Sequence, residues 1–416
     1  MQQNDQQSPG YAYEPVNVDL RFHPASLELR NGEQYNVRGL FGRGGFSVVY
    51  RVRDRNGYQY AAKVLAQRAN RYSSRHELEA YHKIVQNPHT NLLSLHLAGE
   101  LMNPPQGYTD EVIITEACGP SIKDIMMRAR GDVGNFRLPS FSTDDIKQIG
   151  RQIGEGLLHL ENLNIYHLDL KAANVTFMNT VKYEVDANLA QPIITMSDLR
   201  IKIIDYGNSS SHWIPGIKRR HTVVQPQNLR APEIFMGIPH NEKSDVWSMG
   251  CLMGELYIGR VLFIARLGVT QAERQQSQFE LMVSRMNATV PDELMEMSRR
   301  GRRCNLDFNF LNNREGNSEQ DLLMNLMREE SDLPLFQFLQ FVFQSCRETI
   351  IRGTSQPRVS YKLLSSHFYS KPAFVHFSCF LPGFLFTCYE FIVSNTSLIQ
   401  TPSTESPVSL KQPFSM

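Results

Sequence analysis

The chain has 416 residues, more than one ordinary hydrophobic core organises, so its length predicts two lobes or domains with tails. Its 43 basic and 42 acidic residues nearly cancel, and this balance gives no argument for nucleic acid as the main ligand. The six cysteines lack the spacing of a metal site or a disulfide framework, and the N-terminus does not resemble a signal peptide. We therefore expect an intracellular protein, in the nucleus, the cytoplasm or both.

The N-terminal part combines a polar tail with a glycine-rich turn. Residues 1–33 are rich in Gln, Asn, Pro and Tyr without a sustained apolar period, which predicts a flexible tail running into a short strand. The core is expected to start near Tyr35. Glycines then separate two β-rich runs over residues 40–50, where they would let backbone amides approach phosphate oxygens. On its own, such a hairpin is more often a plain turn.

One lysine stands where a solvated lysine would be out of place. Lys63 lies in the apolar strand predicted over residues 60–64, so it requires an acidic partner. The helical segment that follows, residues 75–85, offers Glu77 and Glu79. The apolar stripe of this helix puts Glu77 on its inward edge and favours Glu77 as the partner. That stripe consists of Leu78, Tyr81 and Ile84.

Two further apolar elements precede the residues that point to chemistry. Residues 112–120 have the pattern of a strand that ends at a Gly-Pro break, and an ordinary buried strand and turn explains them equally well. Residues 143–162 carry Ile and Leu at helical spacing behind Ser142, a plausible helix start. We expect this helix to be a buried scaffold that leads directly into His167.

The stretch 167–174 carries the groups that phosphoryl transfer requires. It contains Asp169, Lys171 and Asn174, and Asp205 follows further along on a Gly-hinged turn. In that chemistry one carboxylate orients a hydroxyl, a cation neutralises the moving phosphoryl group, and an amide oxygen and a second carboxylate hold Mg²⁺. A polar surface loop is the alternative interpretation, and the ordered pair of motifs disfavours it.

These residues resemble the H-R-D-x-K-x-x-N catalytic loop and the D-F-G metal turn of eukaryotic protein kinases. The resemblance implies an α+β, bilobal fold, with a small β-rich N-lobe over residues 34–116 and a larger, mostly helical C-lobe over residues 117–370. It implies an ATP- and Mg²⁺-dependent protein kinase, active as a monomer on Ser/Thr hydroxyls of protein substrates, with Tyr as an open alternative. No direct nucleic-acid partner is implied.

The resemblance assigns the reacting groups residue by residue. Asp169 and Lys171 are the expected catalytic residues, and Asn174 and Asp205 are the expected metal ligands. Three residues nearby are expected to be structural. Asp245 would brace the catalytic-loop backbone, and Glu233 would pair with Arg358.

The resemblance also assigns the ATP site. Lys63 is expected to bind the α- and β-phosphates and Glu77 to fix that lysine. Thr115 is expected at the back of the pocket, with the backbone of Glu116 to Cys118 facing adenine. The glycine-rich loop and the strands beside it complete the expected ATP-binding set: Gly42, Arg43, Gly44, Gly45, Phe46, Ser47, Val49 and Ala61.

Further features narrow the resemblance to the CMGC group of kinases. A tyrosine-containing insertion that starts at Asn179 is similar to the hairpin of LAMMER (CDC-like) kinases, and residues 279–291 look like a degraded form of the helix that names them. Asn208 with Trp213 is similar to SR-protein kinases. Both kinds of kinase favour Arg/Ser-rich segments, so splicing-factor-like proteins are the implied substrates.

The chain also departs from the family pattern. Leu168 stands where most active kinases have an arginine that binds an activation-loop phosphate, so switching by phosphorylation is predicted to be weak. Pro226 replaces a threonine that bridges the catalytic Asp and Lys, and Gln227 replaces the arginine after it. Tyr206 for Phe is predicted to be conservative packing. A pseudokinase scaffold, which keeps the fold without efficient turnover, therefore stays open.

Two further segments affect the expected substrate preference and membrane association of the protein. The basic run from Lys218 to His221, together with Ala173 in place of a glutamate, predicts a weakened preference for arginine, although a solvated loop tip explains the run equally well. Residues 371–416 are an atypical tail, apolar over 373–393 and then rich in Ser, Thr and Pro. Pro382 and Glu390 interrupt the apolar run, so packing on the C-lobe is favoured over a membrane segment.

Overall fold

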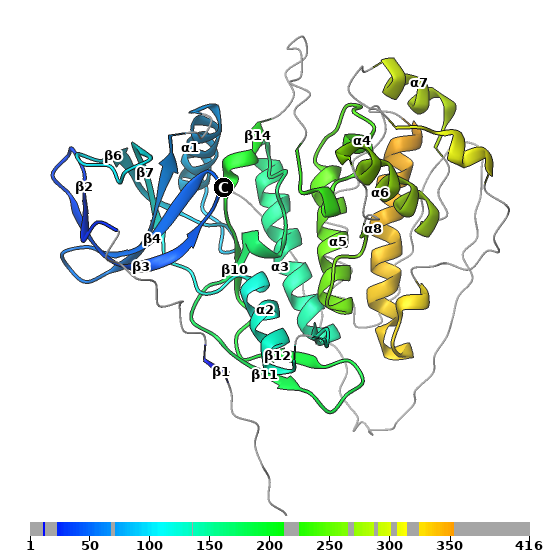
Figure 1. The fold of residues 1–416 in the computed structure, drawn as a ribbon, viewed down its shortest axis with the longest axis horizontal. Coiled ribbons are helices and arrows are strands. Elements are labelled where there is room, and N and C mark those ends of the chain that lie inside the picture. The colour runs from blue at the N-terminus through cyan, green and yellow to red at the C-terminus, as the bar shows by residue number, and fades with distance from the viewer. Residues whose placement is uncertain are drawn as a thin grey trace, which may run out of the picture. The chain divides into compact units, whose positions relative to one another are not determined.

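The computed structural model describes residues 11–12, 23–67, 71–134, 136–211, 224–264, 270–286, 290–300, 306–313 and 324–352. The chain divides into two compact units, residues 1–370 and 371–416, and all described residues belong to the first. Figure 1 shows in that unit a β-rich N-lobe and a mostly helical C-lobe, as the sequence predicts. The apolar tail, the basic run from Lys218 to His221, and Arg358 lie outside the described residues.

The N-lobe is a six-stranded antiparallel sheet in the order β2-β3-β4-β5-β7-β6. Alternate residues of the central strands face its core, as Val48, Tyr50 and Val52 show with exposed fractions of 0%. The sheet carries the helix α1 (Arg71–Gln86). The strands are β2 (Ser26–Glu28), β3 (Gln34–Arg43), β4 (Ser47–Arg53), β5 (Gln59–Ala66), β6 (Leu95–Glu100) and β7 (Tyr108–Glu116).

The sheet starts earlier than the predicted tail boundary at residue 33. Strand β2 pairs with β3, and Leu27 and Leu29 beside this pairing are only 1% exposed. Two leucines in alternation place both side chains on one face of an extended chain, and that face closes the N-lobe core. Strand β2 thus supplies a short strand at the end of the tail, as predicted, and its polar neighbours keep the pattern from becoming a sustained apolar period.

The C-lobe is built around the buried helix α5 (Lys243–Ile258). Helices α3 (Thr143–Asn162) and α8 (Leu333–Arg352) both contact it. Gly250 permits a close approach to α8, because a Cβ added there would lie 2.8 Å from a methyl carbon of Val342. Ser142 caps α3 by accepting the Asp145 N–H at 3.1 Å, as the start signal predicts.

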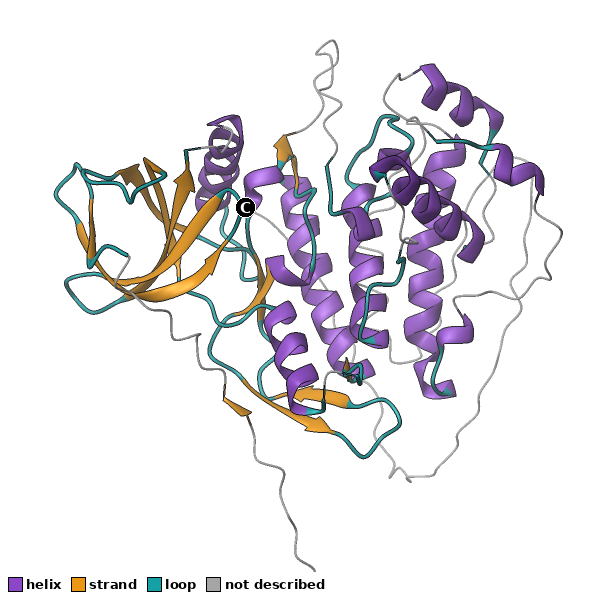
Figure 2. Cartoon of the chain, viewed as in Figure 1, coloured by secondary structure: helices purple, strands orange, loops and turns teal. Residues whose placement is uncertain are grey.

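The remaining C-lobe helices surround this centre (Figure 2). Among the described residues, none of the helices has the length and apolar character needed to cross a bilayer. The further α-helices are α2 (Ile122–Asp132), α4 (Pro232–Phe235), α6 (Gln271–Arg285) and α7 (Asp292–Arg300). The 3₁₀ turns outside the site are η5 (Asn309–Asn313), η6 (Met324–Leu326) and η7 (Glu330–Asp332).

Short strands flank the catalytic stretch and form the insertion. The predicted hairpin is present as β11 (Lys182–Asp186) paired antiparallel with β12 (Ile193–Met196). Its sheet continues through β8 (Ser140–Phe141) on one side and β1 (Tyr11–Ala12) on the other. The catalytic stretch lies between two ladders, which pair β9 (Ile165–Tyr166) with β14 (Ser210–Ser211) and β10 (Val175–Phe177) with β13 (Ile201–Ile203).

Candidate active site

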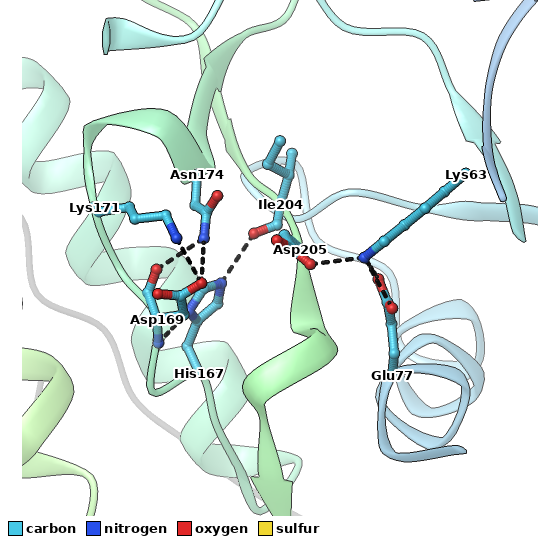
Figure 3. A network of polar contacts seen from close by, with 8 residues as sticks. All are labelled: Lys63, Glu77, His167, Asp169, Lys171, Asn174, Ile204 and Asp205. Atoms are coloured by element: carbon cyan, nitrogen blue, oxygen red, sulfur yellow. Dashed lines mark hydrogen bonds and ion pairs between the residues drawn. The ribbon is translucent and has the colours of Figure 1, made fainter. Parts of the chain in front are cut away.

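The ammonium group of Lys63 connects the two lobes (Figure 3). Lys63 Nζ on β5 donates to both carboxylate oxygens of Glu77 on α1, at 2.7 and 2.9 Å, and to Asp205 Oδ1 in the C-lobe at 2.8 Å. Glu79 instead has a 63% exposed side chain that lies 3.6 Å from His76. The apolar stripe of α1 thus indicated the correct partner, and the pairing of Lys63 with Glu77 is confirmed.

The two carboxylates stabilise the ammonium form of Lys63 between them. Burial alone would lower the pKa of Lys63, but the carboxylates of Glu77 and Asp205 outweigh it and raise that pKa above its ordinary value. The same ammonium lowers the pKa of Asp205 to about 2. Burial raises the pKa of Glu77, and Lys63 opposes this shift. The lysine therefore stays protonated and positioned for an anion.

The catalytic stretch holds one carboxylate oxygen of Asp169 by hydrogen bonds and leaves the other available to a substrate. Asp169 Oδ2 accepts from Lys171 Nζ at 2.8 Å and from Asn174 Nδ2 at 3.0 Å (Figure 3). Asn174 ends the turn η2 (Ala172–Asn174) and also donates to the Asp169 carbonyl at 2.9 Å. Within the described part of the chain, Asp169 Oδ1 has no hydrogen-bond donor. That oxygen is available to accept from a substrate hydroxyl.

Two side chains fix the backbone of this stretch. Asp245 on α5 accepts the N–H groups of His167 at 2.7 Å and Leu168 at 2.8 Å, so the predicted brace is confirmed. The His167 ring accepts the Asp169 N–H through Nδ1 at 3.2 Å, and therefore donates from Nε2 to the Ile204 carbonyl at 3.0 Å. The catalytic and metal turns are thereby tied to each other.

Tyr206 does more than the conservative packing predicted for it. Its ring meets Tyr81 of α1 edge-on at 5.1 Å between centroids and His167 at 5.7 Å. Its hydroxyl donates to the Ile203 carbonyl at 3.0 Å and accepts the Leu93 N–H at 3.2 Å. A phenylalanine could make the ring contacts but not these two hydrogen bonds.

The predicted phosphate lid is the turn between β3 and β4. Gly42 and Arg43 end β3, Ser47 begins β4, and Gly44, Gly45 and Phe46 form the turn between them. The Gly44 N–H donates to the Ser47 carbonyl at 2.8 Å. No atom lies within 4 Å of a Cβ added at Gly42 or Gly45, so space is open beside their backbone. Phe46 at the tip is 69% exposed.

Four residues of the predicted ATP-binding set share one face of the sheet. Val49 pairs with Lys63, and Ala61 pairs with Thr115. Because Ala61 lies two residues before Lys63, all four side chains point to the same side. Thr115 is 5% exposed, and its hydroxyl donates to the carbonyl of Glu116 at 3.2 Å.

A lysine that was not among the predicted site residues anchors the end of β7. Lys202 Nζ on β13, 6% exposed at the residue level, donates to Glu116 Oε1 at 2.9 Å and to the Leu92 carbonyl at 3.0 Å. Glu116 also accepts the Ser94 N–H at 2.8 Å. Burial raises the pKa of the Cys118 thiol to about 11, so this cysteine stays neutral.

The predicted metal ligands fit a hard divalent cation. Asn174 uses its amide nitrogen on Asp169, which leaves its oxygen, and Asp205 uses Oδ1 on Lys63, which leaves Oδ2. The Ile204 N–H donates to the Asn174 carbonyl at 2.9 Å and keeps the two ligand residues adjacent. In the described segments no cluster of three or more His, Cys, Asp or Glu could hold a metal. Two protein oxygen ligands, with phosphate and water oxygens completing the shell, match the coordination preference of Mg²⁺.

Comparison with known proteins agrees with this geometry. The protein kinase domain model matches residues 35–332. A probable dual specificity protein kinase YAK1 homolog from Encephalitozoon cuniculi is 26% identical over 65% of this chain and 59% of its own length. Serine/threonine-protein kinase AFC3 from Arabidopsis thaliana is 23% identical over 60% of this chain and 61% of its own length.

A human relative and a solved structure complete the comparison. Dual specificity protein kinase CLK4 from Homo sapiens is 23% identical over 64% of this chain and 52% of its own length. These alignments thus span between 52% and 61% of the relatives' lengths. A crystal structure of a kinase domain superimposes with a TM-score of 0.61 at 21% identity, over 85% of this chain and 100% of that one. With relatives in the CMGC group and a matching fold, the chain belongs to the protein kinase domain family.

Proposed function

We propose that this protein transfers the γ-phosphoryl group of MgATP to Ser or Thr hydroxyls of protein substrates, with Tyr as a further acceptor. One observation carries the proposal. Lys63 Nζ is held at once by Glu77 of the N-lobe and Asp205 of the C-lobe, at 2.7 and 2.8 Å. A lysine fixed in this way presents its charge where the α- and β-phosphates of ATP are expected.

The catalytic stretch supplies the remaining roles. Asp169 orients the acceptor hydroxyl with Oδ1, and Lys171, 2.8 Å from Oδ2, offers positive charge to the transferred group. Asn174 and Asp205 hold the metal through their remaining oxygens. The bound Mg²⁺ would neutralise charge on the phosphates.

The contacts of Asp169 favour turnover over a pseudokinase scaffold. Pro226 has no hydroxyl with which to bridge the catalytic Asp and Lys, and this loss motivated the scaffold alternative. Asp169 nevertheless keeps two side-chain donors, from Lys171 and Asn174. Its carboxylate is therefore oriented without the missing threonine.

The resemblance to LAMMER and SR-protein kinases supports Arg/Ser-rich, splicing-factor-like substrates for a monomeric enzyme in the nucleus or the cytoplasm. The basic run from Lys218 to His221 argues for a weaker arginine preference than such kinases have. A peptide array separates these two expectations. Strong selection for arginine beside the acceptor would exclude the weakened preference, whereas acidic selection that disappears when the basic residues become Ala would support it.

Turnover of MgATP by the full chain tests the proposed function. Wild type is compared with Asp205→Ala, which lacks the expected metal carboxylate, and with Asp198→Ala as a matched control. Asp198 precedes Asp205 by seven residues in the chain, and its one ion pair among the described residues is a surface pair with Arg200. Wild type and Asp198→Ala should transfer phosphate and Asp205→Ala should not. Wild-type turnover no higher than that of Asp205→Ala would favour the scaffold.

A further inference from the structure

A buried glutamine sits where the loop before α4 meets the catalytic stretch. We call residues 224–231 the substrate loop, because this loop contacts the residue that precedes Asp169. Gln225 is 7% exposed and has a left-handed backbone with φ of 64°. Its N–H donates to the carbonyl of Leu168 at 3.1 Å, and Leu168 is itself left-handed with φ of 58°. Non-glycine residues adopt this conformation only where their surroundings impose it.

The side-chain amide of Gln225 connects the substrate loop to α5 and to the loop's own last residue. Its Nε2 donates to the Ser244 carbonyl at 2.7 Å and to Ser248 Oγ at 3.0 Å, both on α5, and its Oε1 accepts the Ala231 N–H at 2.8 Å. A backbone acceptor on one side and a backbone donor on the other fix which way the amide points. Ser248 extends the connection by donating to the Leu229 carbonyl at 2.9 Å.

Helix α5 therefore supports both the catalytic stretch and the substrate loop. Asp245 on this helix holds the backbone of the catalytic stretch. Ser244 and Ser248, one residue before and three after, hold the substrate loop through Gln225. Every one of these contacts involves a neutral amide, hydroxyl or backbone group, or the buried carboxylate. None requires a phosphate, which Leu168 could not bind.

We propose that Gln225 is a positioning residue whose buried amide holds the substrate loop against α5 and the catalytic stretch, so that a bound peptide presents its hydroxyl to Asp169. The inference rests on the proposed kinase function and deepens it. It explains how the peptide-binding side of the site is ordered although two common kinase residues are missing there. Leu168 replaces an arginine that binds a phosphate, and Pro226 replaces a threonine that bridges the catalytic Asp and Lys.

The test compares two buried glutamines in the full chain. Gln225→Met keeps the length of the side chain and the backbone requirement but removes the amide. Gln152→Met is the matched control, because Gln152 is 8% exposed and its amide joins Asn91, Leu199 and Ile201 away from the substrate loop. Both variants lose buried hydrogen bonds, so a purely structural role would affect them alike.

Steady-state kinetics provide the first measurement. In Gln225→Met the KM for peptide should rise by about tenfold or more while the KM for ATP stays within about twofold, because only the acceptor side is displaced. Gln152→Met should leave the peptide KM at the wild-type value. An unchanged peptide KM in Gln225→Met, or an equal rise in both variants, would overturn the proposal.

Amide hydrogen exchange provides a measurement that does not depend on turnover. Exchange over residues 224–231 and around Leu168 should accelerate in Gln225→Met and not in Gln152→Met. If wild type shows no turnover, the proposed function fails while this result still decides the role of Gln225. Should Gln225→Met not fold, Ser248→Ala removes one contact of the same amide and should change peptide KM and exchange in the same direction. Wild-type exchange in that folded variant would count against the proposal.

Discussion

Replacing Asp245 by Ala would remove the brace of the catalytic stretch. The change leaves the N–H groups of His167 and Leu168 without their acceptor, and these residues are 0% and 1% exposed. Each buried donor without a partner costs about 1–3 kcal/mol, so the pair costs about 2–6 kcal/mol. Burial raises the pKa of Asp245, which shows that the buried charge is itself unfavourable, and its removal offsets part of this cost. We expect a net loss of about 2–4 kcal/mol, a large fraction of the stability of a typical domain.

Urea unfolding followed by the fluorescence of the buried Trp247 measures this loss. Asp245→Asn retains one acceptor oxygen and should lose less stability than Asp245→Ala. Asp144→Ala is the control, because the Asp144 side chain is 85% exposed in a surface pair with Lys147 and should change stability by less than about 0.5 kcal/mol. A loss below about 1 kcal/mol in Asp245→Ala would refute the reasoning, since that is less than the low end for one unpaired donor.

Three further predictions concern the reaction. Asp169→Asn should remain folded and bind ATP, yet transfer phosphate roughly 10²-fold more slowly or worse, the scale of losing a general base, and unchanged turnover would remove Asp169 from the mechanism. Lys63 holds the pKa of Asp205 at about 2, so their attraction contributes stability above the unfolded pKa that is lost as pH falls through about 2. In Lys63→Met the pKa of Asp205 should therefore rise, which an NMR titration of that carboxyl would show, and an unmoved pKa would contradict the ion pair. Phosphatase treatment of the purified enzyme should leave turnover within about twofold, because Leu168 cannot bind a phosphate; a steep loss would mean that phosphorylation switches it.

The predictable parts of the site are those whose residues lie close together in the sequence or in a regular local pattern. Lys63 stands in an apolar strand and Glu77 on the inward edge of a helical stripe. The local periodicity of the sequence was therefore enough to predict their pairing. Asp169, Lys171 and Asn174 fall within six consecutive residues. Their chemistry therefore follows from residue type and order.

The parts that could not be predicted depend on contacts between distant segments. Lys202 alternates with two isoleucines like a solvent-facing residue of a strand, yet it is 6% exposed and bonds Glu116 and the Leu92 carbonyl, more than 80 residues earlier in the chain. Gln225 lies beside a proline in a loop without any period, and its partners on α5 begin 19 residues later. No local pattern encodes which buried acceptor such an amide will meet.

The hydroxyl of Tyr206 has a consequence for synthetic inhibitors. A compound that requires the metal turn to swing out of the core must pull this ring from its place between Tyr81 and His167. In this kinase it must also break the hydrogen bonds of the hydroxyl with Ile203 and Leu93. Leaving those buried groups unpaired costs about 1–3 kcal/mol, which is about a 5- to 150-fold loss of affinity. Such compounds should bind this protein more weakly than kinases with phenylalanine at this position, while compounds that leave the turn in place should bind both equally well.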